Sequence, residues 1–331
     1  MADLDTVEII ARCLCQANEL SWKLPKSTLP LDTGICHCNS CRHGTGTLGG
    51  FMACEWPLPV PELMGCSRVA FSPRADVYFC ATCGTLIFMR KRTQPPWTGL
   101  ALGALEDPTA ICRLTMHLCL ADTKDGGMSV WLDRVNGARL KKYADADLQS
   151  EFEGVTAKGG GEGNLKASCK CRGVQFEITR SRELSDKAIA AQERPSSKGK
   201  YTAIVCVCDS CRLSVGCEVM AWAFIPAVNI LHDNNEPLPD PPVFGTIKHY
   251  ASSEGTDRYF CGGCGAVVFL TSKRRPKLFN VAVGLFHDES GARAEDWLCY
   301  TTSTGPENAS DGLKRNFLTK DLTKQMITWG R

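Results

Sequence analysis

The sequence predicts a mainly β protein made of two tandem, cysteine-rich domains that are related by an internal duplication. Two copies of one ordered pattern, with seven cysteines each, contain 14 of the 20 cysteines. The residues around these cysteines match between the copies, and the segments that separate them have the composition of short strands. Repetition of whole motifs in the same order indicates a duplicated structural unit.

Three cysteine motifs occur in the same order in both copies. The first copy contains Cys13-x-Cys15, Cys36-x-Cys38-x-x-Cys41 and Cys80-x-x-Cys83. The second copy contains Cys169-x-Cys171, Cys206-x-Cys208-x-x-Cys211 and Cys261-x-x-Cys264. ICHCNSCR corresponds to VCVCDSCR, YFCATCGTLIF to YFCGGCGAVVF, and LALGALEDP to VAVGLFHDE. The offset between the copies grows from 156 residues at Cys13 to 181 residues at Cys80, so the second copy carries insertions.

Composition between the motifs divides the chain into two domains. We expect the first domain at residues 1–152, a Gly-rich flexible linker at 153–168 and the second domain at 169–331. The second domain contains a charged insertion at 180–200, in which one short helix is expected, a proline-rich insertion at 233–243 and a C-terminal extension. We interpret both insertions as surface loops, and the alternative is a substrate lid.

Short segments rich in β-branched and aromatic residues and bounded by turn residues predict strands. In the second copy they are 201–205, 219–225, 266–271 and 278–286, and in the first copy 77–79, 85–89 and 129–132. A helical period is visible near the C-terminus, in LKRNFLTKDLTKQMI, where we expect a helix. Each copy is therefore expected to be mainly β, with its strands bridged by metal.

Composition argues against several classes of function. The 38 Lys and Arg residues nearly balance the 36 Asp and Glu residues, so nucleic acid and anionic membranes are not expected as partners. No segment has the roughly 18–20 apolar residues of a membrane span, and the N-terminus lacks the charged-then-apolar pattern of a signal region. We expect a soluble, cytoplasmic protein. In a reducing compartment, clustered thiols are metal ligands more often than they are disulfides.

Seven thiols per copy suit two zinc ions. The pairs C-x-C and C-x-x-C together supply the four ligands of a closed structural zinc, and the triplet C-x-C-x-x-C leaves three thiols for a second ion. Three protein ligands with an open fourth position are the arrangement of a catalytic zinc. Three thiolates make the metal a modest Lewis acid, which suits binding of a substrate thiol better than acidification of water. Up to four Zn²⁺ ions per chain are therefore expected.

Other uses of these cysteines remain open. An iron–sulfur cluster usually needs four thiolates, one more than the triplet offers. Disulfides would leave one odd thiol in each set of seven. Two purely structural zinc ions per copy, with one ligand from elsewhere in the chain, are the strongest alternative. The cysteines outside the repeated motifs are expected to be small core residues, and they are Cys54, Cys66, Cys112, Cys119, Cys217 and Cys299.

The order of these motifs resembles the glutathione-dependent formaldehyde-activating enzyme family, which also includes centromere protein V. The resemblance is carried by Cys13/Cys15, CHCNSCR at 36–42, FCATCG at 79–84 and GALEDP at 103–108. His117, Trp131 and NGARLKKY at 136–143 resemble the closing stretch of the family. The resemblance covers nearly all of residues 7–145 and, more loosely, residues 165–300.

The resemblance implies a β-tent fold for each copy and assigns the zinc ions. It implies structural zinc ions on Cys13, Cys15, Cys80 and Cys83 and on Cys169, Cys171, Cys261 and Cys264. It implies catalytic zinc ions on Cys36, Cys38 and Cys41 and on Cys206, Cys208 and Cys211. The implied activity is carbon–sulfur lyase chemistry of the S-(hydroxymethyl)glutathione synthase type, with glutathione or a similar thiol as co-substrate.

Two side chains of the first copy are candidate catalytic residues. His37 could carry a proton for an alkoxide, and Arg42 could bind a substrate carboxylate. The alternatives are a packed or hydrogen-bonded ring for His37, and charge compensation of the thiolates for Arg42 and its counterpart Arg212. His43 and His117 are weaker candidates, for which a structural role is expected.

The two copies differ in these side chains although all seven ligands remain. Val207 stands where the first copy has His37, and the segment 295–302 has no evident counterpart of His117. We expect the first copy to be active and the second to complete an internal pseudo-dimer. A different substrate for the second copy, or one pocket shared by both metal sites, remain open.

The predicted function is a zinc-dependent carbon–sulfur lyase-type enzyme that forms or breaks the adduct of a small-molecule thiol and an electrophilic carbon such as an aldehyde. One alternative is the same scaffold acting on a bulkier carbonyl or thioether metabolite, which a roomy pocket lined by the second-copy insertions would favour. The other is a non-catalytic zinc-binding module of the centromere protein V type. A basic extension would favour that module, and the chain shows only a local KRR at 273–275.

Overall fold

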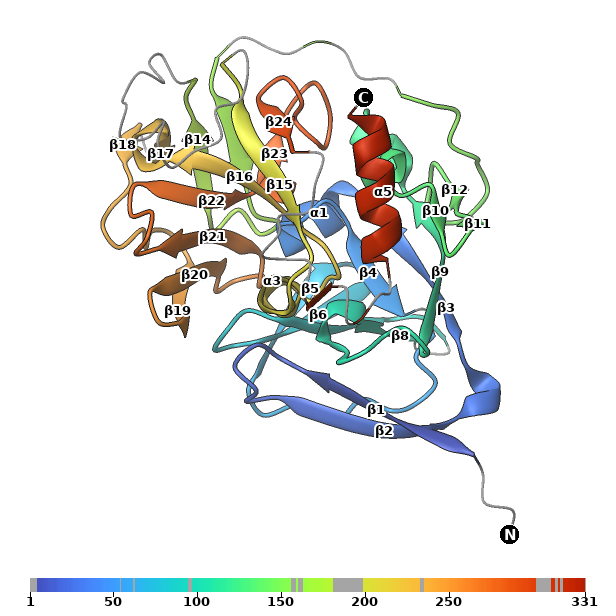
Figure 1. Cartoon of the computed structure of the whole chain (residues 1–331). Coiled ribbons are helices and arrows are strands. Elements are labelled where there is room, and N and C mark those ends of the chain that lie inside the picture. The colour runs from blue at the N-terminus through green and yellow to red at the C-terminus, as the bar shows by residue number, and fades with distance from the viewer. Residues whose placement is uncertain are drawn as a thin grey trace.

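The computed structural model of the chain describes residues 5–53, 55–61, 63–94, 97–155, 159, 163–180, 199–232, 235–301, 311–312, 315 and 318–330 (Figure 1). All structural statements below concern these residues. Strands dominate them, in two large sheets and three smaller ones. The fold class is mainly β, as predicted, and each copy of the duplication contributes one large sheet.

The first copy forms an eight-stranded sheet and two hairpins. Its strands are β1 (Thr6–Arg12), β2 (Glu19–Pro25), β3 (Leu31–Cys36), β4 (Gly50–Ala53), β5 (Cys66–Ser72), β6 (Ala75–Cys80), β7 (Leu86–Lys91), β8 (Trp97–Ala101), β9 (Cys112–Leu118), β10 (Arg134–Val135), β11 (Ala138–Arg139) and β12 (Lys141–Lys142). The sheet has the order β12-β9-β3-β4-β8-β7-β6-β5, while β1 pairs with β2 and β10 with β11. Its helical segments are α1 (Asn39–Thr45) and the 3-10 turns η1 (Lys26–Thr28), η2 (Leu102–Ala104), η3 (Leu120–Thr123) and η4 (Gly127–Val130).

The second copy forms a seven-stranded and a five-stranded sheet. Its strands are β13 (Leu165–Ser168), β14 (Gln175–Ile178), β15 (Tyr201–Cys206), β16 (Met220–Pro226), β17 (Ile230–His232), β18 (Glu236–Pro237), β19 (Ile247–Ser253), β20 (Thr256–Cys261), β21 (Val267–Ser272), β22 (Leu278–Ala282), β23 (Phe286–His287) and β24 (Leu298–Tyr300). The orders are β19-β20-β21-β22-β16-β15-β24 and β18-β17-β14-β13-β23. Its helical segments are α3 (Asp209–Val215), η5 (Ala227–Asn229), η6 (Val283–Leu285) and the C-terminal α5 (Thr319–Trp329).

The two large sheets share one order of seven strands. The sequence β9-β3-β4-β8-β7-β6-β5 in the first copy corresponds to β24-β15-β16-β22-β21-β20-β19 in the second. The pairs β3–β9 and β15–β24 are parallel, whereas the other pairs within the shared order are antiparallel. A register shift occurs at Tyr78/Phe79 in one copy and at the corresponding Tyr259/Phe260 in the other. The duplication in the sequence is therefore also a duplication of the fold.

Most strands expected from residue patterns are confirmed. The segments 77–79, 85–89, 201–205, 219–225 and 266–271 lie in β6, β7, β15, β16 and β21, with bounds that differ by one or two residues. These are the segments in which apolar, β-branched residues run continuously, as expected of strands that are buried on both faces.

Two expectations differ from the structure. The segment 278–286 is interrupted by η6, so it forms β22 and the two-residue β23 instead of one strand. The strand expected at 129–132 is wrong, because η4 and a turn occupy this segment. Gly126 and Gly127 have φ values of 80° and 54°, and these left-handed conformations turn the chain just before the segment 129–132. Its apolar side chains fill the core, and a short apolar run of this kind does not distinguish a strand from a buried turn.

Other expectations concern the linker, the insertions and the C-terminus. β13 begins at Leu165, inside the segment 153–168 expected to be linker, and the domain boundaries stay a prediction. The helix expected within 180–200 lies almost entirely outside the described residues. The C-terminal helix is present as α5, and Arg315, which lies in the periodic pattern before α5, is helical as well. None of the described helices is both long and apolar enough to cross a membrane.

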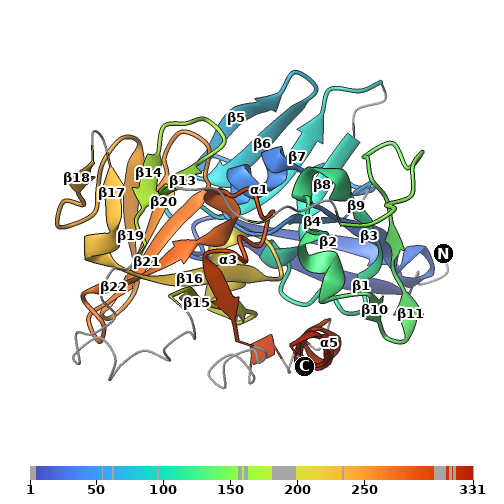
Figure 2. The same ribbon diagram turned by 90° about the horizontal axis from the view of Figure 1, so that it is seen from above.

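Reciprocal contacts join the two copies, which lie side by side in Figure 2. The N–H of Gly284 donates to the carbonyl of Gly46 at 3.0 Å, and the N–H of Gly103 donates to the carbonyl of Gly216 at 3.1 Å. Gly46 corresponds to Gly216 and Gly103 to Gly284, so one contact is made twice. A Cβ at Gly103 would lie 2.3 Å from a backbone nitrogen of the second copy, which leaves no room for a side chain. Most of the buried apolar residues of both copies belong to one continuous core.

The C-terminal helix α5 packs against the first copy, beside β10 (Figures 1 and 2). The side-chain oxygen of Gln325 accepts from the N–H of Asp133 at 2.8 Å, and its amide nitrogen donates to the carbonyl of Arg134 at 2.8 Å. Asp321 accepts from the N–H of Asn136 at 2.7 Å. The chain thus returns from the second copy to the first before it ends.

Candidate metal centres

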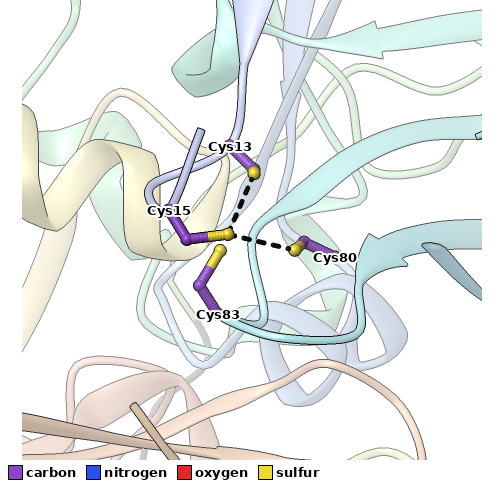
Figure 3. Close-up of side chains that lie close together, drawn as sticks. All are labelled: Cys13, Cys15, Cys80 and Cys83. Carbon is purple, nitrogen blue, oxygen red and sulfur yellow. Dashed lines mark hydrogen bonds between the residues drawn. The ribbon is translucent and has the colours of Figure 1, made fainter. Parts of the chain in front are cut away.

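The C-x-C and C-x-x-C motifs of each copy converge in space. In the first copy, Cys13 and Cys15 follow β1, while Cys80 is the last residue of β6 and Cys83 lies in the turn between β6 and β7. Their four sulfur atoms lie within 4.8 Å of one another (Figure 3). In the second copy the same arrangement is formed by Cys169, Cys171, Cys261 and Cys264. None of the 19 described cysteines forms a disulfide.

The spacing of these sulfurs fits a tetrahedral metal ion. A zinc ion with Zn–S bonds of about 2.3 Å separates its sulfur ligands by about 3.8 Å. The Sγ atoms of Cys13 and Cys15 are 3.4 Å apart, and those of Cys15 and Cys80 are 3.6 Å apart. Hydrogen bonds from Cys13 and Cys80, together with burial, raise the pKa of Cys83 well above its usual value. Four such thiols ionise together only beside a cation, so each cluster has the donor set of a closed thiolate site.

Each triplet lies where a central strand ends and a short helix begins. Cys36 is the last residue of β3, Cys38 caps α1, and Cys41 lies in the first turn of that helix. The N–H of Cys41 donates to Cys38 Sγ at 3.3 Å. The three sulfurs lie within 4.8 Å of one another, as do those of the second-copy triplet formed by Cys206, Cys208 and Cys211. All three first-copy cysteines are partly exposed, whereas Cys206 and Cys211 are buried.

A fourth thiol lies beside the first-copy triplet. Cys119 follows the last residue of β9, and its Sγ is 3.8 Å from Cys36 Sγ. Residue patterns missed this cysteine because it belongs to no repeated motif. The residues around Cys119 in the sequence give little sign of this role. Cys119 comes close to Cys36 because β9 pairs in parallel with β3, which places Leu118 opposite Cys36.

His37 faces away from the triplet into the core. Its Nε2 lies 3.0 Å from Nδ1 of His117, whose Nε2 lies 2.8 Å from the carbonyl of Leu132. Both rings are 0% exposed, and burial lowers the pKa of both, to about 4 for His117. A carbonyl only accepts, so His117 carries its proton on Nε2 and accepts from His37 through Nδ1. The bare Nδ1 of His37 is buried and has no hydrogen-bond partner among the described residues.

The arginines that follow the triplets are held differently. Arg212 is 2% exposed, and its Nη1 donates to the carbonyls of Gly103 at 2.6 Å and Leu105 at 2.7 Å across the interface between copies. Its Nε donates to the carboxylate of Asp209 at 2.8 Å. Arg212 is therefore fixed by Asp209 and the first copy, and each of its three side-chain nitrogens has a hydrogen-bond partner.

Arg42 lacks the partners of Arg212. Its Nη2 donates to Oδ1 of Asn39 at 2.5 Å, and Asn39 stands where the second copy has Asp209. Nε and Nη1 of Arg42 are buried and without a hydrogen bond in the described structure, although the side chain is only 5% exposed. Burial lowers the pKa of Arg42, and Asp125 and Asp122 oppose this shift. A buried cation with two nitrogens that make no hydrogen bond is costly unless an anion reaches it.

A cavity of about 210 Å³ lies between the copies at Arg42. The first copy contributes α1, the end of η3 and Lys124 after it, and the second contributes the segment 286–292. Charges of both signs line the cavity, including Arg42, Lys124, Asp122 and Glu289. The imidazoles of His43 and His287 stack at 4.3 Å on its wall, and burial lowers the pKa of both.

The second copy holds the loop that follows Cys119. The N–H of Arg293 donates to the Asp125 carboxylate at 2.7 Å, and its Nη1 donates to the carbonyls of Asp125 and Gly127, each at 2.7 Å. The N–H of Ala292 donates to the carbonyl of Thr123 at 2.9 Å. Burial raises the pKa of Asp125, and Arg293 partly offsets this effect. The first-copy site is therefore completed by the second copy.

The C-terminal segment covers the corresponding place in the second copy. Arg315 is 8% exposed; it pairs with Glu218 at 2.6 Å and with Asp209 at 3.0 Å, and it donates to the carbonyl of Val207 at 2.8 Å. Val207 lies between two cysteines of the triplet. Gly312 also lies close to this loop, because a Cβ at this position would lie 2.8 Å from the Val207 side chain. Both Gly312 and Arg315 are therefore packed against the triplet loop.

Comparison with known proteins agrees with this architecture. The family profile described as "Glutathione-dependent formaldehyde-activating enzyme" matches residues 8–121 and 164–302, once for each copy. Fold and cysteine clusters thus define a duplicated, cysteine-rich β protein that can hold metal in each half. The chain belongs to the glutathione-dependent formaldehyde-activating enzyme family. The searches of curated proteins and of solved structures found no match.

Proposed function

We propose that the protein is a zinc-dependent carbon–sulfur lyase-type enzyme whose reaction takes place at the first-copy triplet. The observation that carries this proposal is the partly exposed set of Cys36, Cys38 and Cys41 next to a cavity that contains the underpaired Arg42. Asn39 and Arg42 line that cavity, and each directly follows a cysteine of the triplet. Two cysteines of the second-copy triplet, Cys206 and Cys211, are buried, and the C-terminal segment contacts the triplet loop, which supports a structural role for it.

The proposed reaction is the addition of a thiol to an aldehyde, or its reverse. The S–H bond of the thiol breaks, a C–S bond forms at the carbonyl carbon, and the proton ends on the former carbonyl oxygen. A zinc ion held by the three cysteines would supply the positive charge that keeps the thiol ionised at neutral pH. Glutathione or a similar small thiol is the proposed co-substrate, which agrees with the family to which the chain belongs.

Arg42 is the proposed binding residue for a carboxylate of the thiol substrate. An anion in the cavity would neutralise a guanidinium that has one side-chain partner in the described structure. Lys124 lines the same cavity but is already paired with Glu289 at 2.7 Å. The acidic side chains that line the cavity would suit the amino group of a zwitterionic thiol.

His37 is the second residue proposed for the reaction. Its bare Nδ1 can accept a proton, but the ring is fully buried and does not line the cavity. A Cβ built at Gly127 would come within 2.8 Å of that nitrogen, so this turn separates it from the outside. We therefore propose that His37 acts as a positioning residue, which ties the triplet loop to β9 through His117.

Exchange NMR with glutathione and formaldehyde tests the function, because it measures how fast formaldehyde leaves and rejoins the thiol. Cys38→Ser and Cys208→Ser form a matched pair of variants at corresponding positions. We expect the wild type to accelerate exchange, the Cys38 variant to lose the acceleration, and the Cys208 variant to keep most of it. The measurement is repeated with a panel of small and bulky aldehydes. Exchange rates that are equal with and without the wild-type protein for every aldehyde would refute the lyase assignment.

A further inference from the structure

The turn that carries Cys119 has an uncommon backbone conformation. Cys119 has φ 58° and ψ 39°, a left-handed conformation that glycine and asparagine usually occupy. Such a conformation is unfavourable for a non-glycine residue and persists only where its surroundings hold it. Hydrogen bonds from Cys119 N–H to the carbonyl of Asp145 and from Asp122 N–H to the carbonyl of Cys119 hold this turn. Strain of this kind is commonly found where a side chain must face a functional site.

The left-handed turn brings the thiol of Cys119 against the triplet. Its Sγ is 3.8 Å from Cys36 Sγ, which is the sulfur–sulfur separation of about 3.8 Å in a tetrahedral zinc–thiolate site. Cys119 is 9% exposed. The sulfur lies outside the group of three whose members are all within 4.8 Å of one another. It therefore stands at the edge of the ligand set, beside Cys36.

The second copy has no equivalent thiol. Its last cysteine is Cys299, and the register places Cys299 opposite Thr202, four residues before the triplet begins at Cys206. In the first copy, Leu118 is opposite Cys36 and Cys119 is the next residue. The copies thus share three thiols at this place, and the fourth belongs to the first copy alone.

We propose that Cys119 is a fourth thiolate ligand of the first-copy metal site and occupies the position that a substrate thiol takes over. Because one thiolate replaces another, the charge at the site does not change, and Cys119 accepts the proton that the incoming thiol loses. Resting protein would then hold a closed four-thiolate site in the first copy and a three-thiolate site in the second. The ligand assignment rests on the metal-binding part of the proposed function, and the exchange rests on its thiol chemistry.

Release of Zn²⁺ to a chromogenic chelator tests the ligand assignment without measuring activity. The variants are Cys119→Ser, Cys38→Ser and, as the matched control outside all clusters, Cys299→Ser. We expect one zinc ion per chain to leave the Cys119 variant at least about tenfold faster than the wild type, since loss of even an outer partner of a metal site weakens it by about 10–100-fold. The Cys299 variant should release zinc at the wild-type rate, and the Cys38 variant should contain about one ion fewer.

Absorption of the Co²⁺-loaded protein gives a second readout, because the sulfur-to-cobalt charge-transfer band grows with the number of bound thiolates. The band of the Cys119 variant should be weaker by the contribution of one thiolate. Saturation of the wild type with glutathione should leave the intensity of the band unchanged, because one thiolate replaces another. Wild-type zinc release and an unchanged band in both Cys119→Ser and Cys119→Ala would overturn the inference. An unchanged metal content in Cys38→Ser would instead overturn the proposed function, since the triplet would then hold no metal.

Discussion

Two arginines at corresponding positions show how one neighbouring residue changes the role of a side chain. Asp209 neutralises Arg212, and first-copy carbonyls accept hydrogen bonds from both of its Nη atoms. Asn39 gives Arg42 a hydrogen bond but no charge, so a cation stays underpaired at the wall of the cavity. The difference between an amide and a carboxylate thus separates a structural arginine from a candidate anion-binding one.

Asn39→Asp should make the surroundings of Arg42 resemble those of Arg212. The new carboxylate would pair with Arg42, so we expect KM for glutathione to rise by about tenfold and the protein to gain up to about 1 kcal/mol of unfolding free energy. Steady-state rates should show the change in KM with little change in kcat. Asp209→Asn is the control, since it should leave the KM at the wild-type value. An unchanged KM in Asn39→Asp would argue against Arg42 as the carboxylate site.

The His37–His117 pair should behave as one structural unit. His37→Val copies the residue of the second copy, and it leaves Nδ1 of His117 buried without a donor, so we expect a loss of about 1–3 kcal/mol in unfolding free energy. The double variant His37→Val/His117→Leu removes both partners and should recover part of that loss. Urea unfolding measures both effects. Additive losses in the double variant would show that the hydrogen bond contributes nothing.

At the scale of elements, the C-terminal segment links the copies. Arg315 is buried against Glu218 and Asp209 of the second copy, while α5 is bound to the β10 region of the first. Burial raises the pKa of Glu218, and Arg315 and Arg212 counteract this shift. Glu218 is 3% exposed, so its charge depends on these arginines.

Arg315→Met should destabilise the protein in a pH-dependent way. Glu218 has a folded-state pKa above its unfolded value near 4.5, so its contribution is fully present below pH 4.5 and is lost as pH rises through the folded pKa. Without Arg315 that pKa rises further, while Arg212 and Asp209 remain nearby. We expect a loss of about 3–5 kcal/mol at pH 8 and a smaller loss at pH 5.5, measured by urea unfolding. Arg315→Lys should keep most of the stability, and an equal loss of Arg315→Met at both pH values would contradict this account.

Sequence reasoning succeeded for elements whose signal is local. Continuous β-branched runs predicted β15, β16 and β21, and the spacing of the cysteines together with the family resemblance predicted which cysteines share a cluster. It failed at 129–132, where apolar residues fill the core from a 3-10 turn, and it did not anticipate α1 and α3. Cys119 was out of reach because its neighbours are set by a strand pairing across more than 80 residues. The surroundings of Arg42 depend on the other copy, which no local pattern describes.

At the scale of the whole molecule, the copies are fitted to each other through glycines. A Cβ at Gly103 would lie 2.3 Å from the backbone nitrogen of Cys217, and a Cβ at the corresponding Gly284 would lie 2.2 Å from the carbonyl oxygen of Thr47. We expect Gly103→Ala and Gly284→Ala each to cost more than about 3 kcal/mol, because backbone on both sides must move. Thermal unfolding measures this, with Gly65→Ala as a control that meets only a side chain, at 3.4 Å. A loss of unfolding free energy below about 1 kcal/mol in either variant would mean that the backbone at the interface can move aside at little cost.

The reciprocal glycine contacts between the copies have a consequence for how the two sites can change. In a symmetric dimer of identical chains, every substitution appears in both subunits, so a residue that serves one site is imposed on the other. Here each half is encoded separately while the contacts that hold the halves together are kept. The first half can therefore retain an underpaired arginine and an extra thiol, while the second uses its corresponding positions for stability. Joining the halves in one chain also makes their association independent of protein concentration, so diluting the protein should not separate the site from the half that completes it.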